Sequence, residues 1–372
     1  MIIHLLLIFL SCVVIWRASD GFELASEYLG RKLGDGVRGA TINAIASSMP
    51  ELFTTLWFLF VLHDRDGFAG GIGTTAGSAI FNGMIIPAIV ILAVIGFGLS
   101  RNVVVSRKVI LRDGIALLLA EVILIIVITG STLDWWHGLI MMSVYVVYVV
   151  IMLITMQGRD PEDQKNDWPQ IHTLHHGSFF RSLLTLDLAP IFIKDQINAR
   201  NAWSLLIVSM LIIGASCALL VVACEDSALA LGIHTYFVAV VLASAATSVP
   251  DTIISYKDAM IGEYDDAVAN ALGSNIFDIC FALGFPLFVY TLVSGPVTMS
   301  TETVENVTEL LVILLFSTLV AFLIYLLGRS LGRWKAFLLL TIYLLFMFFT
   351  ASKAFEVPWA LEFGAFLRNL IS

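Results

Sequence analysis

The chain has 372 residues, of which 59% are hydrophobic and 13% charged, with a formal net charge of −9 and a mean hydropathy of +0.94. A soluble domain has about 45–50% apolar and about 25% charged residues, so the composition excludes a soluble protein and indicates an integral membrane protein. The negative charge gives no support to nucleic acid as a partner. The apolar runs reach the roughly 20 residues that a transmembrane helix needs, and the alternating segments of a β-barrel are absent.

The sequence predicts an all-α polytopic membrane protein with ten transmembrane helices. In chain order we expect them at 2–16 (with a helical extension toward 33), 40–62, 70–98, 109–130, 135–156, 202–224, 233–257, 266–294, 307–328 and 334–352. Residues 1–16 lack the basic start and the cleavage site of a signal peptide, so we retain them as the first helix. The tail at 357–371 is too short to span and is expected at the membrane interface.

The placement of Lys and Arg predicts the orientation. Of the 20 basic residues, all but Arg65, Lys353 and Arg368 fall in the odd-numbered loops or at the helix ends beside them. Cytoplasmic loops of membrane proteins are enriched in Lys and Arg. We therefore expect both termini to be extracytoplasmic and the loop at 157–201 to be cytoplasmic. Lys257, at one helix end, is expected to reach the cytoplasmic interface.

Two motifs occur twice in the chain. Ala-Ser-Ser-Met-Pro-Glu (46–51) matches Ala-Thr-Ser-Val-Pro-Asp (246–251), and Gly-Ser-Ala-Ile-Phe-Asn (77–82) matches Gly-Ser-Asn-Ile-Phe-Asp (273–278). The duplication predicts four parts: a first repeat at 1–156, a cytoplasmic linker at 157–201, a second repeat at 202–352 and an interfacial C-terminal tail at 353–372. Five helices per repeat is an odd number, so the second repeat inserts upside down, giving two inverted five-helix repeats.

The first motif places carboxylates inside the membrane. Glu51 and Asp251 lie in apolar spans, where a charged side chain is costly and is functional by default. Pro50 and Pro250 each remove a helical hydrogen bond, which frees a backbone carbonyl oxygen. The hydroxyls that precede the prolines belong to Ser47, Ser48, Thr247 and Ser248. Ligands that are all oxygen suit hard cations such as Ca²⁺, Mg²⁺ and Na⁺, and two facing carboxylates match the charge of one Ca²⁺ or of several Na⁺.

The second motif adds further oxygens. Ser78 and Asn82 are four residues apart, as are Ser274 and Asp278, so each pair shares one helix face. The glycine before each serine permits close helix approach. Polar residues that merely join helices are an alternative interpretation of the serines, but one that suits the charged Asp278 less well. The repeats together therefore carry three acids and one amide.

One acid, Glu121 in the fourth span, has no counterpart in the second repeat. A polar neighbour, protonation or a proton route would each account for it, and its role stays open. We find no P-loop, HExxH motif or nucleophile elbow, so we expect neither an enzyme nor a bound cofactor.

These motifs resemble the α-repeats of the sodium/calcium exchanger families within the cation/Ca²⁺ antiporter superfamily, most closely the potassium-dependent sodium/calcium exchangers. The residues that carry the likeness are Ser-Ser-Met-Pro-Glu-Leu-Phe-Thr (47–54), both Gly-Ser motifs, Thr-Ser-Val-Pro-Asp (247–251) and Arg112-Asp113. The resemblance implies ten helices, with the first and sixth long and sliding past a core of the other eight. It also implies electrogenic exchange of several Na⁺ for one Ca²⁺.

The resemblance further implies roles for individual residues. Glu51 and Asp251 would ligate Ca²⁺, and Asp278 matches an acid linked to potassium dependence. The residues implied near Ca²⁺ or Na⁺ are Ser47, Ser48, Thr247, Ser248, Ser78 and Ser274, with the backbone carbonyls of Ala44 and Ser244 facing sodium. The usual glycine before the hydroxyl pair is replaced by alanine at Ala46 and Ala246.

The sequence therefore predicts a secondary antiporter that exchanges Na⁺ for Ca²⁺ by alternating access, with potassium co-transport left open. The alternative within the same fold is a Ca²⁺/H⁺ antiporter, because an acid buried in the membrane can also carry a proton. A receptor or scaffold without transport activity would not need mirrored acids in mid-membrane. The stoichiometry, the membrane that holds the protein and the oligomeric state stay open.

Overall fold

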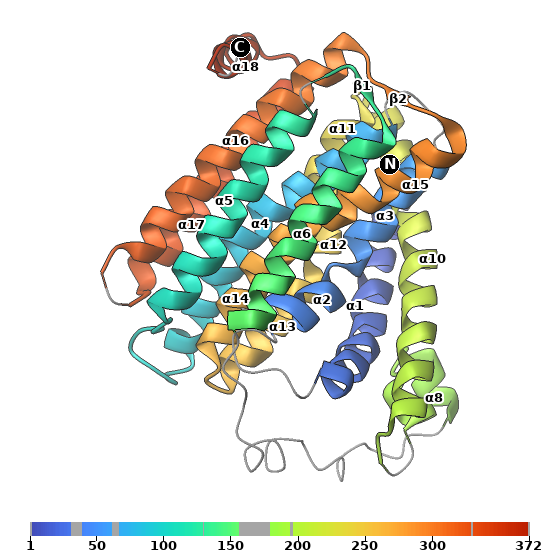
Figure 1. Ribbon diagram of the computed structural model, residues 1–372, viewed down its shortest axis with the longest axis vertical. Coiled ribbons are helices and arrows are strands. Elements are labelled where there is room, and N and C mark those ends of the chain that lie inside the picture. The colour runs from blue at the N-terminus through green and yellow to red at the C-terminus, as the bar shows by residue number, and fades with distance from the viewer. Residues whose placement is uncertain are drawn as a thin grey trace.

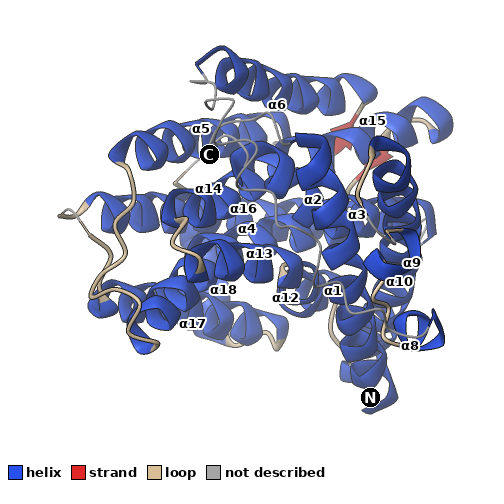
Figure 2. Ribbon diagram, turned by 90° about the horizontal axis from the view of Figure 1, so that it is seen from below, coloured by secondary structure: helices blue, strands red, loops and turns tan. Residues whose placement is uncertain are grey.

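The computed structural model describes residues 2–30, 39–61, 67–128, 130–155, 179–193, 196–328 and 330–370, and these residues are almost entirely helical (Figures 1 and 2). The first half contains α1 (Ile2–Gly30), the broken segment η1 (Gly39–Asn43), α2 (Ala44–Ser47) and α3 (Met49–Val61), then α4 (Gly67–Gly96), α5 (Arg107–Ile128), β1 (Thr132–Leu133) and α6 (Trp135–Thr155). Of the predicted linker at 157–201, residues 157–178, 194 and 195 lie outside the described residues.

The second half follows the same order. Two short helices, α8 (Phe179–Leu184) and α9 (Ala189–Phe192), precede α10 (Ala199–Leu231). The second broken segment comprises α11 (Thr235–Val238), η2 (Ala239–Ala243), α12 (Ser244–Thr247) and α13 (Val249–Met260). The remaining elements are α14 (Tyr264–Phe277), η3 (Asp278–Ala282), α15 (Leu283–Ser294), β2 (Val297–Thr298), α16 (Thr301–Leu326), α17 (Arg333–Ala354) and α18 (Pro358–Arg368).

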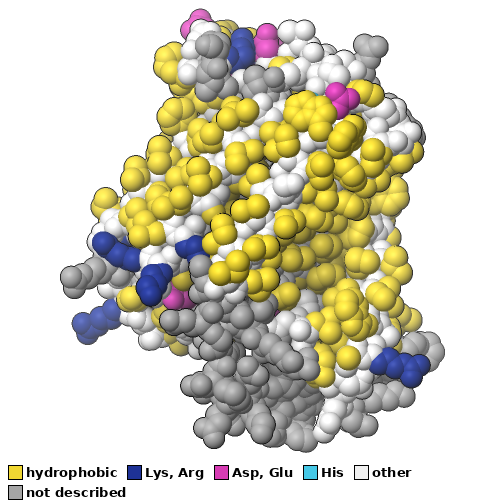
Figure 3. All heavy atoms as spheres, viewed as in Figure 1, with side chains coloured by type: hydrophobic (Ala, Val, Ile, Leu, Met, Phe, Trp, Pro, Cys, Tyr) yellow, Lys and Arg dark blue, Asp and Glu magenta, His cyan; other side chains and the backbone are white. Residues whose placement is uncertain are grey.

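Among the described residues, eight helical stretches are long and apolar enough to cross a membrane, and a ninth is the pair 40–47 and 49–61, bent by 45°. The predicted helix that is absent from these nine is the fourth in chain order, α5. Its 22 residues include Arg112, Asp113 and Glu121, which make it more polar than the others. One face of α5 packs against α14 and α16, while side chains such as Leu119 are exposed on the other face. Figure 3 shows hydrophobic side chains over the middle of the molecule, with most visible Lys and Arg toward one end. The chain is thus a multi-pass membrane protein, as predicted.

The first helices of the two halves are antiparallel. His4 at the start of α1 lies 3.4 Å from Asp226 near the end of α10. Further along α1, the carbonyl oxygen of Ser11 accepts a hydrogen bond from Ser216 Oγ at 3.1 Å. Residue numbers rise along one helix as they fall along the other, which is the relation that inverted repeats require.

The fourth helices are antiparallel as well. At one end of the molecule, Thr132 before α6 pairs with Thr298 before α16 in the small β-sheet. At the other end, Val103 before α5 forms a β-bridge with Leu331 after α16. Because α5 begins where α16 ends, the prediction of two inverted repeats is confirmed. Both chain termini lie toward the same end of the molecule (Figure 1).

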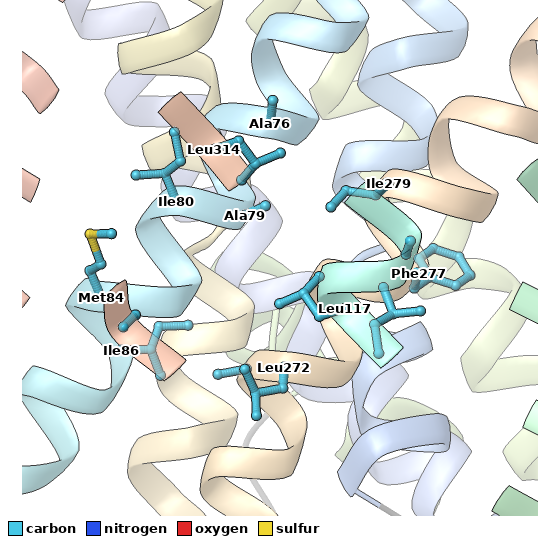
Figure 4. Close-up of a cluster of buried hydrophobic side chains, with 14 of the residues drawn as sticks. Ala76, Ala79, Ile80, Met84, Ile86, Leu117, Leu272, Phe277, Ile279 and Leu314 are labelled. Atoms are coloured by element: carbon cyan, nitrogen blue, oxygen red, sulfur yellow. The ribbon is translucent and has the colours of Figure 1, made fainter. Parts of the chain in front are cut away.

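Two hydrophobic clusters organise the packing. The larger one joins α4, α5, α14 and α16 through side chains such as Ile80, Leu117, Leu272 and Leu314 (Figure 4). A separate cluster joins α1 and α10 to the broken segments. Figure 2 shows α1 and α10 together at one edge, outside the layer that contains α4 and α13. Helices α1 and α10, of 29 and 33 residues, therefore form a layer of their own beside the bundle.

The sixth helix continues about two turns beyond the end of the span predicted for it. The sixth span was expected to end at 224, but α10 continues through Glu225 and Asp226 to Leu231 and ends where Gly232 adopts a φ of +67°. Charged residues do not break a helix that has left the hydrocarbon layer, whereas a glycine in the left-handed conformation does end it.

Candidate cation-binding site

The two broken helices place an acid at equivalent points. Each has a π-helical turn, then a short helix, and is interrupted at Ser48 or Ser248 before the next helix starts. Proline supplies no N–H to the preceding turn, which favours a new helix start at the residue before it. Glu51 and Asp251 therefore lie in the first turns of α3 and α13, where the free N–H groups and the helix dipole stabilise negative charge.

Two glycines let the repeats approach closely. A Cβ atom added to Gly273 would lie 2.6 Å from the carbonyl oxygen of Ala40, and one added to Gly77 would overlap that of Val240. Ala40 and Val240 are equivalent positions of the two repeats, so each repeat seats its glycine against the broken helix of the other. This is the close helix approach that the sequence predicts.

Three acids from the two repeats converge at this crossing. Glu51, Asp251 and Asp278 are fully buried, and each offers an oxygen such that all three oxygens lie within 4.8 Å of one another. Calcium takes oxygen ligands at about 2.3–2.6 Å, so two of its ligands are at most about 5.2 Å apart. The three carboxylate oxygens therefore fit within the ligand shell of one cation.

Side chains of the Gly-Ser motifs (77–82 and 273–278) form hydrogen bonds with Glu51 and Asp251. Ser274 Oγ donates a hydrogen bond to Asp251 Oδ1 at 2.5 Å, and Asn82 Nδ2 donates to Asp251 Oδ2 at 3.0 Å. Ser78 Oγ lies 3.0 Å from Glu51 Oε1. Asp251 is thus held by residues of both repeats, and the Ser47 hydroxyl also lies beside it.

Hydroxyls from the two repeats also meet one another. Ser78 Oγ lies 2.8 Å from Ser248 Oγ, and Ser47 Oγ lies 3.3 Å from Ser274 Oγ. The Thr247 hydroxyl lies beside Glu51. The Ser48 hydroxyl lies beside Asp278, whose Oδ2 is also 3.4 Å from Ser78 Oγ. The structure therefore brings together the side chains that the sequence singles out.

The carbonyls of Ala44 and Ser244 lie one turn before the breaks. Ala44 O accepts a hydrogen bond from Ser48 N at 3.1 Å, and Ser244 O accepts one from Ser248 N at 3.0 Å. Each carbonyl oxygen also accepts a hydroxyl hydrogen bond, Ala44 O from Ser47 Oγ at 3.3 Å and Ser244 O from Thr247 Oγ1 at 3.2 Å, so a cation at either oxygen would take the place of that hydroxyl bond. Their contact with sodium stays a prediction.

The acid cluster carries unbalanced negative charge. No Lys or Arg forms an ion pair with these three acids within the described ranges. Two like charges 4.8 Å apart repel by about 3.5 kcal/mol at an effective dielectric constant of about 20. Glu51 Oε2, Asp278 Oδ1 and Asn82 Oδ1 make no hydrogen bond in the part of the chain that the structure describes. Cations or protons must neutralise this site.

Sequence reasoning missed a layer of asparagines around the acids. Asn270 Nδ2 donates to Ser255 Oγ at 3.0 Å and lies 3.3 Å from the carbonyl oxygen of Asp251. Asn275 Nδ2 donates to the carbonyl oxygen of Ala79 at 2.8 Å, which joins α14 to α4. A helical spacing of four from Ser274 was the available signal for Asn270.

Glu121 lies apart from this cluster. Thr318 Oγ1 of α16 donates to Glu121 Oε1 at 2.6 Å, while Oε2 makes no hydrogen bond among the described residues. At the start of the same helix, Arg112 and Asp113 form two hydrogen bonds of 2.7 and 2.8 Å. The polar neighbour foreseen for Glu121 is therefore Thr318.

Residues 3–154 and 201–351 match the family model described as sodium/calcium exchanger protein. The chain belongs to this family. The exchanger is thus a membrane transporter and not an enzyme, as predicted. Its matched segments carry both copies of the acidic motifs.

Several curated proteins are similar to parts of this exchanger. It is 37% identical over 120 residues to sodium/potassium/calcium exchanger 3 of Mus musculus, covering 32% of this chain and 17% of that protein. It is 32% identical over 161 residues to sodium/potassium/calcium exchanger 2 of Homo sapiens, covering 42% of this chain and 22% of that protein. The exchanger thus matches about a fifth of these relatives' length. An uncharacterised membrane protein of Methanocaldococcus jannaschii is 24% identical over 344 residues, covering 90% of this chain and 94% of that one.

Solved structures share the fold of this exchanger. The H⁺/Ca²⁺ exchanger CAX has a TM-score of 0.61 and 13% identity, covering 99% of this chain and 92% of that one. The sodium-calcium exchanger NCX_Mj has a TM-score of 0.57 and 20% identity, covering 93% and 97%. At these identities the likeness shows the fold alone.

Proposed function

We propose that this exchanger is a secondary antiporter that moves Ca²⁺ against Na⁺ through one shared site. The observation that carries the proposal is the convergence of Glu51, Asp251 and Asp278, with oxygens within 4.8 Å, at the crossing of the two repeats. The site is fully buried and lined by oxygen donors, which suits hard cations. The ligand set we propose adds Asn82, Ser47, Ser48, Thr247, Ser248, Ser78 and Ser274, with the carbonyls of Ala44 and Ser244.

Coupling follows from charge. Buried carboxylates that repel one another oppose a rearrangement until cations neutralise them. One Ca²⁺ or several Na⁺ meet this requirement, and the empty site does not. Each ion therefore permits the step that carries it, and the two fluxes are linked.

The separate layer of α1 and α10 supports a mechanism of alternating access in which this layer moves relative to the bundle. These helices pack on the broken segments through their own hydrophobic cluster. Movement of that layer along the bundle would open the acid cluster to one side and then to the other. We propose further that both termini are extracytoplasmic, from the distribution of Lys and Arg, and that Ca²⁺ leaves the cytoplasm.

Two finer points belong to the same proposal. Asp278 gives the site a third carboxylate, which would balance a K⁺ carried together with Ca²⁺. A Ca²⁺/H⁺ antiporter is the second candidate, and it is favoured by the three neighbouring acids, which can share a proton, and by the fold of CAX. Hydroxyls at every carboxylate favour sodium, because a hydroxyl oxygen can ligate Na⁺.

Flux measurements separate these candidates. Purified protein in liposomes is given ⁴⁵Ca²⁺ under an imposed Na⁺ gradient, then under a pH gradient, each with and without K⁺. We expect uptake driven by the Na⁺ gradient and none in Glu51→Gln or Asp251→Asn, with Glu302→Gln on the exposed start of α16 as the control. Uptake that only a pH gradient drives would replace the sodium proposal with the proton one.

A further inference from the structure

Helices α5 and α6 are consecutive but are held by different partners. Gly114 of α5 packs against Phe322 of α16, leaving no room for a Cβ atom. Gly138 of α6 packs against α15, where an added Cβ would lie 2.7 Å from the backbone nitrogen of Phe288. Because α5 packs closely against α16 and α6 packs closely against α15, the two helices diverge and leave a groove between them.

The groove is apolar and opens toward lipid. Its volume is about 640 Å³, and its walls include Ile115 and Leu119 of α5 and Val147 and Ile151 of α6. These four side chains are 48–59% exposed. Ile276 of α14 forms part of the floor. Figure 1 shows α5 and α6 side by side on one face, and Figure 3 shows hydrophobic side chains over that face.

The length of the groove matches one leaflet of a bilayer. Its α5 wall runs from Arg112 to Ile123, and the difference of eleven positions corresponds to about 16 Å at a rise of about 1.5 Å per residue. Half of a hydrocarbon core about 30 Å thick is about 15 Å. An acyl chain would therefore lie along the groove from the interface to the middle of the membrane.

Positive charge gathers at one end of the groove. Arg112 lines it, and the exposed Lys108 lies one turn earlier on the same face of α5. Asp113 fixes the guanidinium through bonds of 2.7 and 2.8 Å and is itself held by the Tyr148 hydroxyl at 3.1 Å. Basic residues at the mouth of an apolar groove between membrane helices suit an anionic headgroup.

We propose that the groove between α5 and α6 binds an anionic phospholipid of the bilayer. Its phosphate contacts Lys108 and Arg112, and one acyl chain lies along Leu119 and Val147 to Ile276. Ile276 stands between Ser274 and Asp278 in the chain, so this lipid touches the segment that carries two residues of the cation site. The proposal does not depend on which ions the exchanger couples.

Native mass spectrometry of the full-length protein tests this directly. The protein is purified in detergent and titrated with phosphatidylglycerol or with phosphatidylcholine, and the bound fraction is read from the mass. We expect one phosphatidylglycerol to be retained several-fold more tightly than phosphatidylcholine, and the preference to weaken at high salt. Equal retention of the two lipids would overturn the proposal.

Two variants locate the lipid. Lys108→Gln should reduce the preference for phosphatidylglycerol several-fold, and Leu119→Trp should fill the groove and remove the retained lipid. Their matched controls are Arg333→Gln, at an exposed helix start, and Leu344→Trp, which replaces a leucine that is 66% exposed on α17. Unchanged retention in both groove variants would place the lipid elsewhere and refute the site.

A second groove-filling change guards against misfolding. If thermal unfolding shows that Leu119→Trp destabilises the protein, Ser143→Phe on the opposite wall serves instead. The same spectra report oligomers. A dimer that Leu119→Trp or Ser143→Phe abolishes would mean that a second copy of the chain occupies the groove, which overturns the lipid proposal.

Discussion

Trp57 and Lys257 occupy equivalent positions of the two repeats, two hundred residues apart, and each joins a broken helix to one of the two long helices. Trp57 Nε1 donates to the carbonyl oxygen of Gly214 in α10 at 2.8 Å. Lys257 Nζ lies 3.0 Å from Asp20 and 2.9 Å from Glu23 in α1. The sequence predicts only that Lys257 reaches the interface, and the structure adds these two partners.

The two contacts lie on opposite sides of the acid cluster. Each residue follows its acid by six positions, which is about 9 Å along a helix. Because the repeats are inverted, these displacements point in opposite directions. These two contacts therefore attach the layer of α1 and α10 to the bundle toward opposite ends.

Lys257→Gln should favour the state in which α1 has moved. The lysine is 47% exposed, and an exposed ion pair contributes up to about 1 kcal/mol. Its loss should shift the balance between the two access states by up to about fivefold. The measurement is the apparent Ca²⁺ affinity at each face of sided vesicles, with Arg200→Gln as the control.

Trp57→Phe should shift the balance in the opposite direction. The change keeps a ring in the hydrophobic cluster but removes the hydrogen bond to Gly214 in α10. The same sided vesicles report it. Shifts of the same sign in the tryptophan and lysine variants would contradict attachment toward opposite ends.

Gly77→Ala and Gly273→Ala should each destabilise the exchanger. A methyl group at either position meets a backbone carbonyl of the other repeat, and overpacking of this kind costs about 1–3 kcal/mol. Gly83→Ala is the matched control on α4, because its nearest atom would be 3.7 Å away. Thermal unfolding in detergent should give lower Tm values for the first two variants only, and equal Tm values for all three would refute the close packing.

Much of the fold is readable from the sequence because lipid imposes simple rules. Apolar length marks the helices, the duplicated motifs mark the repeats, and an odd number of helices per repeat fixes their inversion. Helix α10 continues beyond the span predicted for it because Glu225 and Asp226 end the apolar run without ending the helix. The polar composition that sets α5 apart comes from the buried Asp113 and Glu121 and from basic residues in its first two turns, and it does not prevent the helix from forming.

The pairing within the site is less predictable. The sequence shows that Asn82 and Asp278 are equivalent, but not that Asn82 bonds to Asp251 of the other repeat. Such contacts depend on how far the broken helices interpenetrate, and that distance is set by Gly77 and Gly273 packing on backbone. The spacing of four from Ser274 could have pointed to Asn270, whereas Asn275 had no such signal, because it bonds to the backbone carbonyl of Ala79.

Asn82→Asp should destabilise the protein when the site is empty. It should also increase the stabilisation that the protein gains when a cation binds. A fourth carboxylate beside Asp251 adds about 3 kcal/mol of repulsion for each close neighbour, which a divalent cation relieves. We expect a lower Tm than wild type in chelator and a larger rise in Tm on adding Ca²⁺. An identical response to Ca²⁺ in the two proteins would argue against cation binding at this position.

Asp278→Asn should leave Na⁺-driven Ca²⁺ uptake in place but remove any stimulation by K⁺. The change withdraws one of three negative charges, while Glu51 and Asp251 still match one Ca²⁺. Uptake by liposomes with and without K⁺ provides the measurement. If K⁺ still stimulates uptake by the Asp278→Asn protein, Asp278 is not required for the potassium dependence.

Glu121→Gln should fold and transport like the wild type. The amide oxygen still accepts the hydrogen bond from Thr318, whereas Glu121→Ala leaves that hydroxyl unpaired and should cost about 1–3 kcal/mol of stability. Thermal unfolding and ⁴⁵Ca²⁺ uptake check the two expectations. Loss of uptake in a well-folded Glu121→Gln protein would instead place this acid on a transport route.

The most direct test of the acid cluster is equilibrium Ca²⁺ binding to the purified exchanger by isothermal titration calorimetry. We expect binding at a single site in the wild type, displacement by Na⁺, and no measurable binding to Glu51→Gln or Asp251→Asn that retain the wild-type unfolding temperature. Undiminished Ca²⁺ binding to either of these folded variants would contradict a site built from both repeats.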